Sequence, residues 1–299
     1  MFGKARLMLV VMCAVLAGAA AACSSEKAPV GEKDGERAAR KPTPVETVRL
    51  AYRDTAEAGS AKVSMAMTGT GLQKAGGSTA PMAFEMTADG AVDFESGDTR
   101  MTMVMEPFGE MEVRSVGGAI YGRLPEQFTA QIPGSRPWMS VDLDAMMREQ
   151  YGAGMSGMGA GGRPAVDQLE YLKGVSDSVE RVGEEEVRGV PTTRYRATID
   201  LRKAMKDDPR PRWAYEETRK QLGTDRLPTE VWLDGENRVR RLEMTVPIQN
   251  PEGGDDSRME IVQEYYDFGV PVNVGPPPAG QTASMEEVMS GMAGQAAAQ

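Results

Sequence analysis

The sequence predicts an α+β protein whose main element is one antiparallel sheet. Between residues 62 and 268, many short segments alternate apolar and polar residues with a period of two, which is typical of strands with one buried face. Turn residues, such as Asp-Gly and Gly-Gly pairs, separate most of these segments. The strands should therefore follow one another as hairpins in a meander. Helical spacing is found in a few short segments, the first of which begins near Val45.

The first 22 residues predict a signal peptide. Lys4 and Arg6 precede the apolar run Leu7–Ala22, which is shorter than the roughly 20 residues of a membrane-spanning helix. The run ends in three alanines followed by Cys23. This resembles a bacterial lipobox, although Ala20 stands where that pattern prefers Leu. We predict that Cys23 is lipidated and that its acyl chains hold the protein on the extracytoplasmic face of the cell membrane. Ordinary secretory cleavage, with Cys23 unmodified, is the alternative.

Two polar segments flank the predicted domain of residues 45–274. Residues 23–44 contain the lipidated cysteine and a segment with almost no large apolar residue, which predicts a disordered tether. Residues 275–299 are predicted to form a flexible C-terminal tail. Its apolar residues from Met285 to Met292 have helical spacing after Ser284, so a short docked helix is the alternative.

The first half of the domain is predicted to be a helix followed by strands. The helix extends from Val45 to about Ala58, and Gly59 ends it. The turns are predicted at a Gly-rich loop of 69–79, at Asp89-Gly90, at 97–98, at 107–109 and at 117–118. The strands between them are predicted at 62–68, 82–87, 91–94, 100–105, 111–114 and 119–124.

The second half of the domain mixes helices and strands. A break at 133–138 precedes a helix that Asp142 caps, and a low-complexity segment, Gly152–Gly162, follows as a connector or as a flap over a cavity. The hairpin of 227–246 has a predicted turn at Asp234-Gly235 and a predicted bulge near Arg240-Arg241. Helices are predicted at 164–175, 200–206 and 212–222, and strands at 178–186, 187–199 and 259–268.

Methionines dominate one face of the predicted sheet. Strand cores usually use β-branched residues, which are stiff, whereas Met is flexible and suits adaptable apolar surfaces. These residues therefore predict either the lining of an apolar cavity or the core of a Met-rich protein. Eight of them fall on one face of four neighbouring strands: Met65, Met67, Met82, Met86, Met101, Met103, Met105 and Met111. The full predicted lining adds Val63, Phe84, Val113, Val231 and Leu233.

Composition argues against several classes of function. The chain has no His, and both Cys lie within the first 23 residues. This excludes Ser-His-Asp triads and His or Cys metal sites in the domain. The formal charge of -10 argues against nucleic acid as a partner. The carboxylates of Glu184–Glu186 and Asp255-Asp256 have the pattern of solvated charge runs. We therefore predict a protein that is not an enzyme and has no catalytic residues, no metal and no cofactor.

Three segments of the domain are GVPTTRYRATIDL (Gly189–Leu201), EVWLDGENRVRRLEM (Glu230–Met244) and YYDFGVPVNV (Tyr265–Val274). They resemble a known family, the actinobacterial LppX/LprG-type lipoproteins of LolA-like fold. The resemblance implies that residues 45–274 are a LolA-like lipid-binding domain. It also implies a strongly curved antiparallel β-sheet, a half-barrel, with helices that cover its concave face and leave an apolar cavity.

The same resemblance implies that the protein binds or shuttles a lipid or glycolipid, with envelope transport proteins as further partners. It supplies no catalytic residues. The alternative is an envelope sensor or protein-interaction module of the same fold without a bound lipid. That alternative predicts an exposed apolar patch, whereas a lipid carrier predicts an enclosed cavity.

Overall fold

The computed structural model describes residues 40–74, 78–106, 109–129, 133–142, 164–206, 215–216, 219–220, 222–248 and 257–288. Pro42–Gln299 forms one compact unit, separate from Met1–Lys41. The predicted signal peptide, Cys23 and most of the predicted tether lie outside the described residues.

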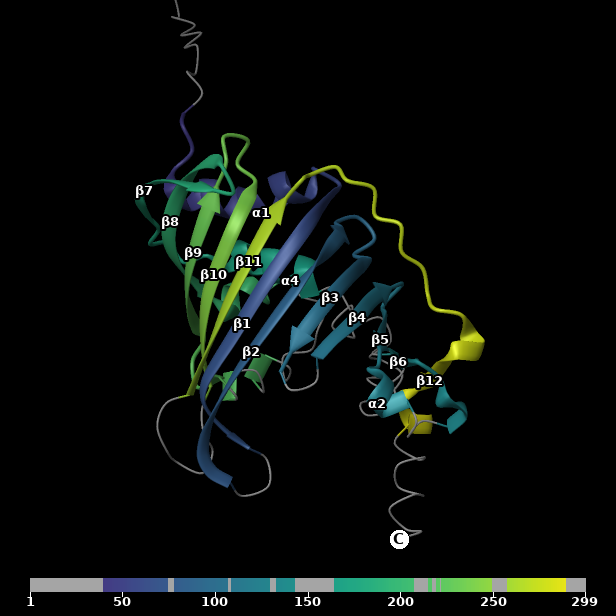
Figure 1. Ribbon diagram of the computed structural model, residues 1–299. Coiled ribbons are helices and arrows are strands. Elements are labelled where there is room, and N and C mark those ends of the chain that lie inside the picture. The colour runs from purple at the N-terminus through teal and green to yellow at the C-terminus, as the bar shows by residue number, and fades with distance from the viewer. Residues whose placement is uncertain are drawn as a thin grey trace, which may run out of the picture. The chain divides into compact units, whose positions relative to one another are not determined.

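One sheet of 12 strands organises the Pro42–Gln299 unit, in the order β12-β6-β5-β4-β3-β2-β1-β11-β10-β9-β8-β7 (Figure 1). The sheet is curved and unclosed, which confirms the predicted fold class. Neighbouring strands are antiparallel except for β12 and β6, which are parallel. The β1–β11 pair joins the meander β2–β6 to the meander β7–β11. The strands are β1 (Ser60–Lys74), β2 (Ser78–Asp93), β3 (Thr99–Met105), β4 (Gly109–Val116), β5 (Ala119–Arg123), β6 (Trp138–Asp142), β7 (Glu180–Val187), β8 (Val190–Asp200), β9 (Arg226–Leu233), β10 (Val239–Ile248), β11 (Ser257–Tyr266) and β12 (Thr282–Ser284).

The helices are short, and α1 (Pro44–Ala56) begins where the sequence predicted. Thr43 and Glu46 form a capping box, which satisfies backbone N–H groups that the first turn leaves free. None of the helices in the described residues is long and apolar enough to cross a membrane. The others are α2 (Glu126–Thr129), α4 (Pro164–Glu170), α5 (Leu201–Ala204) and the 3₁₀ helices η1 (Pro133–Ser135), η3 (Tyr171–Gly174) and η4 (Ala279–Gln281).

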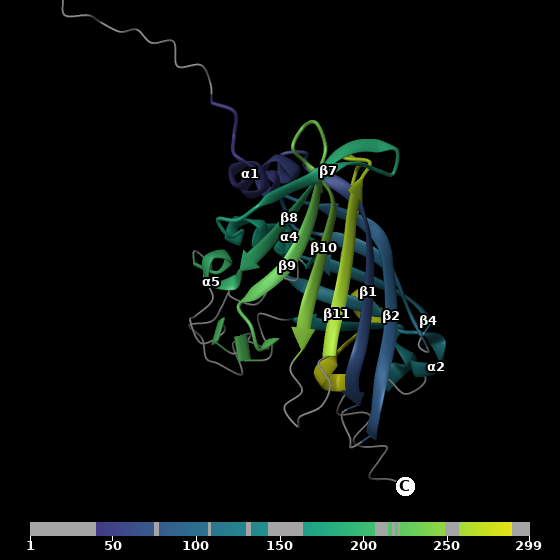
Figure 2. The same cartoon turned by 90° about the vertical axis from the view of Figure 1, so that its left-hand side faces the viewer.

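The main core lies between these helices and one face of the sheet, which we call the inner face. Val48 of α1, Leu169 of α4 and Leu172 of η3 belong to the same buried cluster as Val231 of β9 and Leu242 of β10. Figures 1 and 2 show α1 and α4 on the same side of strands β8–β11. Burial of an apolar side chain contributes about 1.5–3 kcal/mol, so this cluster fixes where the helices sit.

The predicted turn at Asp89-Gly90 is wrong, because β2 continues through it to Asp93. Gly90 pairs with Val63 on β1 and with Met101 on β3. A Cβ atom on Gly90 would lie 2.1 Å from the carbonyl oxygen of Arg100. The glycine therefore permits a close approach of two backbones within the sheet, rather than a turn. The predicted loop of 69–79 is also too long, since β1 extends to Lys74 and β2 begins at Ser78.

The predicted β9–β10 hairpin and its bulge are confirmed, but the turn differs from the predicted one. The pairing register shifts between Val239 and Arg241. Between the two strands the residue with positive φ is Asn237 (60°), rather than Gly235. The Asn237 side chain donates hydrogen bonds to Asp54 Oδ2 (2.6 Å) and to the Thr47 carbonyl oxygen (3.2 Å) on α1. These two hydrogen bonds hold α1 against the β9–β10 turn.

The sequence patterns did not predict two strands, β6 and the edge strand β12. Residues 138–142 form β6, so Asp142 ends a strand, and the predicted helix beyond it lies outside the described residues, as does Gly152–Gly162. Within the predicted tail, residues 279–288 form regular secondary structure. There β12 pairs with β6, and the helical turn of 285–288 follows Ser284. The Ser284 and Glu287 side chains cap this turn reciprocally, and Val288 is buried beside Ala283.

Candidate functional site

Strands β1–β4 bring seven predicted methionines onto the inner face. In one row across the sheet, Met67 pairs with Met86, which pairs with Met105. In the next row, Met65 and Met103 flank Ala88, and Met111 follows on β4. We call this set the methionine surface: Met65, Met67, Met86, Met101, Met103, Met105 and Met111.

Much of the methionine surface is only partly buried. Met65 and Met101 are 8% and 6% exposed, whereas the other five members have intermediate exposure. Phe84 and Val113 on β2 and β4 also have intermediate exposure, and Val63 is fully buried. Met82 pairs with Leu72, and its side chain lies outside the described portion. The surface is therefore apolar and adaptable, and part of it is accessible.

Two of the predicted lining residues lie on β9, three strands away from β1 in the sheet. Val231 and Leu233 are 0% and 3% exposed, and they belong to the cluster that contains Leu169 and Leu172. Strands β10 and β11 separate their strand from β1. The same cluster contains Met65 and Met101. Helices also pack against this part of the inner face, and the role of Val231 and Leu233 in a cavity lining stays a prediction.

Gln263 is an inner-face residue that the sequence analysis missed. It lies on β11 between Met65 on one neighbouring strand and Leu242 on the other, and it is 0% exposed. Neither its Nε2 nor its Oε1 has a hydrogen-bond partner among the described residues. Such burial costs about 1–3 kcal/mol per unsatisfied group. The signal in the sequence is a polar residue at a core position of the alternation Met259, Ile261, Gln263, Tyr265.

Tyr265 lies beside Gln263 on the same face of β11. Burial raises its pKa well above the ordinary value of 10.0, so the phenol stays protonated. Its ring centroid lies 6.0 Å from that of Phe94. The rings of Tyr265 and Phe94 therefore pack against each other at this end of β11.

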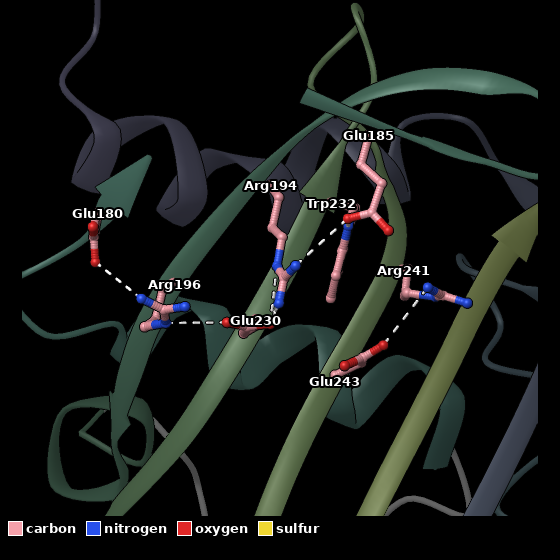
Figure 3. Close-up of polar contacts among 8 residues, drawn as sticks. All are labelled: Glu180, Glu185, Arg194, Arg196, Glu230, Trp232, Arg241 and Glu243. Carbon is pink, nitrogen blue, oxygen red and sulfur yellow. Dashed lines mark hydrogen bonds and ion pairs between the residues drawn. The ribbon is translucent and has the colours of Figure 1, made fainter. Parts of the chain in front are cut away.

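The outer face of strands β7–β10 carries paired charges that surround Trp232 (Figure 3). Arg194 Nε donates to Glu230 Oε2 at 3.0 Å, and Arg196 Nε donates to Glu230 Oε1 at 3.1 Å. Arg196 also contacts Glu180 at 3.3 Å. Alternation along β8 and β9 places these groups opposite the core residues, so this face is polar and solvated.

Trp232 is the large apolar side chain within this charged face. The guanidinium groups of Arg194 and Arg241 lie 5.0 and 5.5 Å from its ring, and its Nε1 donates to Glu185 at 3.0 Å (Figure 3). Burial raises the pKa of the neighbouring Glu243, which lies 3.7 Å from Arg241. Glu184–Glu186 are exposed, as predicted for a solvated charge run.

Two pockets lined by described residues lie away from the methionine surface. One, of about 560 Å³, lies beside α2 and includes Arg100, Glu110, Glu112 and Arg123. Another, of about 570 Å³, includes Glu184–Glu186. Both linings are rich in charge, which does not suit an acyl chain. The apolar candidate site therefore remains the methionine surface.

Known proteins resemble this chain in sequence and in structure. A Streptomyces coelicolor protein named "Putative lipoprotein SCO4650" is 24% identical over 248 residues, which cover 82% of this chain and 76% of that protein. The crystal structure of lipoprotein LppX from Mycobacterium tuberculosis matches with a TM-score of 0.43 and 18% identity, over 76% of this chain and 98% of LppX. LprF from Mycobacterium bovis matches with a TM-score of 0.41 and 17% identity, over 80% and 99% of the two chains. LppX is one of the two lipoproteins after which the group that the sequence resembles is named. No family model matches the chain.

Proposed function

We propose that this protein is a membrane-anchored extracytoplasmic lipoprotein that binds or shuttles a lipid or glycolipid on its inner face. The observation that carries the proposal is the methionine surface, because it places flexible apolar side chains in partly accessible positions on one face. Acyl chains bind by burial of apolar area, at about 25 cal/mol per Å². Such binding needs neither a cofactor nor a catalytic group, so we propose a carrier rather than an enzyme.

The anchor in this proposal is Cys23. The run of alanines before Cys23 supports processing at this residue, and the relative from Streptomyces is itself named as a lipoprotein. Two acyl chains on one cysteine suffice for stable anchoring. Mass spectrometry of the N-terminal peptide from the envelope fraction tests this. A diacylated Cys23 is the expected mature N-terminus, and a mature N-terminus elsewhere with Cys23 unmodified or absent contradicts it.

Native mass spectrometry tests lipid binding. The unit Pro42–Gln299 contains every residue of the main core cluster, so it is the part to purify from its own host without detergent. The expected result is a discrete added mass that organic solvent extracts. A bare mass, together with no uptake from vesicles of host lipids, contradicts the proposal.

A second candidate function is an envelope sensor or protein-interaction module. The intermediate exposure of Met67, Met86 and Met103 favours it, since exposed apolar patches often mark protein interfaces. Crosslinking from a photoreactive methionine analogue on the intact cell separates the two candidates. Adducts with lipid support the carrier, whereas adducts with a single protein and no lipid support the module.

A further inference from the structure

The pocket beside α2 lies on the outer face of the sheet, on the other side of the strands that carry the methionine surface. Arg100 and Thr102 line it from β3, where they alternate with methionines of the inner face. Strands β4 and β5 contribute Glu110, Glu112 and Arg123. The volume of about 560 Å³ is in the range of small-ligand sites.

One wall of this pocket is held in place by contacts of the backbone. It is formed by Leu124, Pro125 and Pro137, and the Leu124 N–H donates to the Pro137 carbonyl oxygen at 2.9 Å. Next to Pro137, Arg136 Nη1 donates to the Thr282 carbonyl oxygen on β12 at 3.0 Å. A wall that is fixed before a ligand binds lowers the entropic cost of binding.

The charges that line the pocket fall into two groups. Glu112 lies 2.8 Å from Arg100 Nε, so these two charges compensate each other. The side chains of Arg123, Glu110 and Glu126 are exposed and have neither an ion pair nor a hydrogen-bond partner among the described residues. A ligand in this pocket therefore meets one cation and two carboxylates that are not already paired.

The unpaired charges are spaced for a ligand that carries both signs. Val113 on β4 pairs with Gly122 on β5, so Arg123 lies one strand from Glu112, and Glu110 lies two residues further along β4. One strand spacing and two residues correspond to roughly 8 Å. The two termini of an extended tripeptide are a comparable distance apart, since each residue adds about 3.4 Å.

From this geometry we propose that the pocket binds a short peptide with free termini, about three residues long. The Arg123 guanidinium donates bidentate hydrogen bonds to the C-terminal carboxylate, for which its planar fork is suited. The carboxylates of Glu110 and Glu126 accept from the N-terminal ammonium group, and the apolar wall contacts the peptide side chains. The site is separate from the methionine surface, so the inference does not rest on lipid binding.

The test compares peptides that differ only at their termini. Tri-alanine with both termini free, its C-terminal amide and its N-acetyl derivative are titrated into Pro42–Gln299, and binding is followed by NMR chemical shifts. The wild type should bind free tri-alanine with a Kd below about 1 mM. Amidation and acetylation should each weaken binding by roughly tenfold, because each removes one charge that the pocket pairs.

Variants assign each terminus to its partner. Arg123→Gln should weaken binding of free tri-alanine by about tenfold and leave binding of the amide unchanged, because the amide has no carboxylate to lose. Glu110→Gln with Glu126→Gln should likewise weaken binding of the free peptide but not of the N-acetyl peptide. Arg258→Gln is the matched control. It removes an arginine whose side chain is 66% exposed and does not line the pocket, and it should leave the affinity for all three peptides unchanged.

Three outcomes would overturn the proposal. One is the same affinity for all three peptides in the wild type, and another is an unchanged preference for the free carboxylate in Arg123→Gln. The third is the absence of peptide binding at about 10 mM, whether or not a neutral trisaccharide such as maltotriose binds instead. The substituted side chains are exposed, so urea unfolding should show wild-type stability for each variant.

Discussion

The inner face has two halves that are built on the same alternation but packed differently. In the helix-covered half, β8–β10, Ile199, Val231 and Leu242 are 0–1% exposed beneath α1, α4 and η3. In the methionine half, β1–β4, Met86 and Met103 are only partly buried. Branched side chains lose little freedom when they pack into a fixed core, whereas Met can adapt to a changing neighbour. One half is therefore a closed core beneath helices, whereas the other keeps partly accessible apolar side chains, which is the property that the proposed function uses.

Truncation of a core leucine should give the largest loss in the free energy of unfolding. Leu242→Ala should lower the free energy of unfolding by about 2–5 kcal/mol, because the helices cannot fill the cavity that it leaves. Met103→Ala in the methionine half is the matched truncation and should cost less than half as much, since Met103 is partly accessible. Urea unfolding followed by circular dichroism measures both. If both variants lose the same free energy of unfolding, the two halves of the inner face do not differ in packing.

Substitution of Asp234 should give the next largest loss in the free energy of unfolding, because the turn that contains Asp234 holds α1 against the sheet. The Asp234 side chain is 3% exposed and pairs with Arg240 at 2.7 Å and Arg238 at 3.0 Å. Asp234→Asn should cost about 1–3 kcal/mol at pH 7. Glu236→Gln, whose wild-type side chain is 71% exposed on the same turn, is the control and should cost under about 0.5 kcal/mol.

The Asp234 effect should depend on pH with a definite sign. Burial by itself raises the pKa of this carboxyl, but hydrogen bonds from the Arg238 amide and from the Arg240 and Arg238 side chains outweigh it and lower the pKa below 3.8. A lowered pKa contributes stability above the unfolded value, and this stability is lost as pH falls through the folded value. The difference between wild type and Asp234→Asn should therefore shrink below about pH 4. A difference that stays constant between pH 7 and pH 3 would contradict this.

Polar substitution in the methionine half should alter binding more than stability. Met86→Gln with Met103→Gln places two amides on the accessible apolar surface, so uptake of a fluorescent fatty acid should weaken by about tenfold. The free energy of unfolding should change by less than about 1.5 kcal/mol. The outer-face pair Thr87→Gln with Val104→Gln, on the same two strands, is the control and should leave binding unchanged.

Loss of the N-cap of α1 should give the smallest decrease in the free energy of unfolding. Thr43→Ala removes the hydrogen bond that the Glu46 N–H donates to Thr43 Oγ1 and should cost about 1 kcal/mol. Thr43→Ser keeps the hydroxyl and should therefore retain most of the stability that Thr43→Ala loses. Lipid uptake should not change in either variant, because the cap lies outside the methionine surface.

Sequence patterns predicted the elements that depend on local chemistry. The start of α1 was correct because Thr43, Pro44 and Glu46 are cap residues whose partners lie within one turn. The placement of seven of the eight predicted methionines on one face was correct because alternation along a strand requires it. The turn predicted at Asp89-Gly90 was wrong, since the same dipeptide fits a turn or a close contact between strands.

The alternation, the caps, the strand-rich fold class and the methionine-rich face thus follow from the order of residues alone. Three features depend on the folded chain: which part of that face the helices cover, the pairing of β12 with β6, and the burial of Gln263 without a partner among the described residues. The two groups of features differ in the sequence distance between the residues that interact. A period of two or a capping box acts between residues a few positions apart, whereas the neighbours of Gln263 on β1 and β10 come from distant parts of the chain.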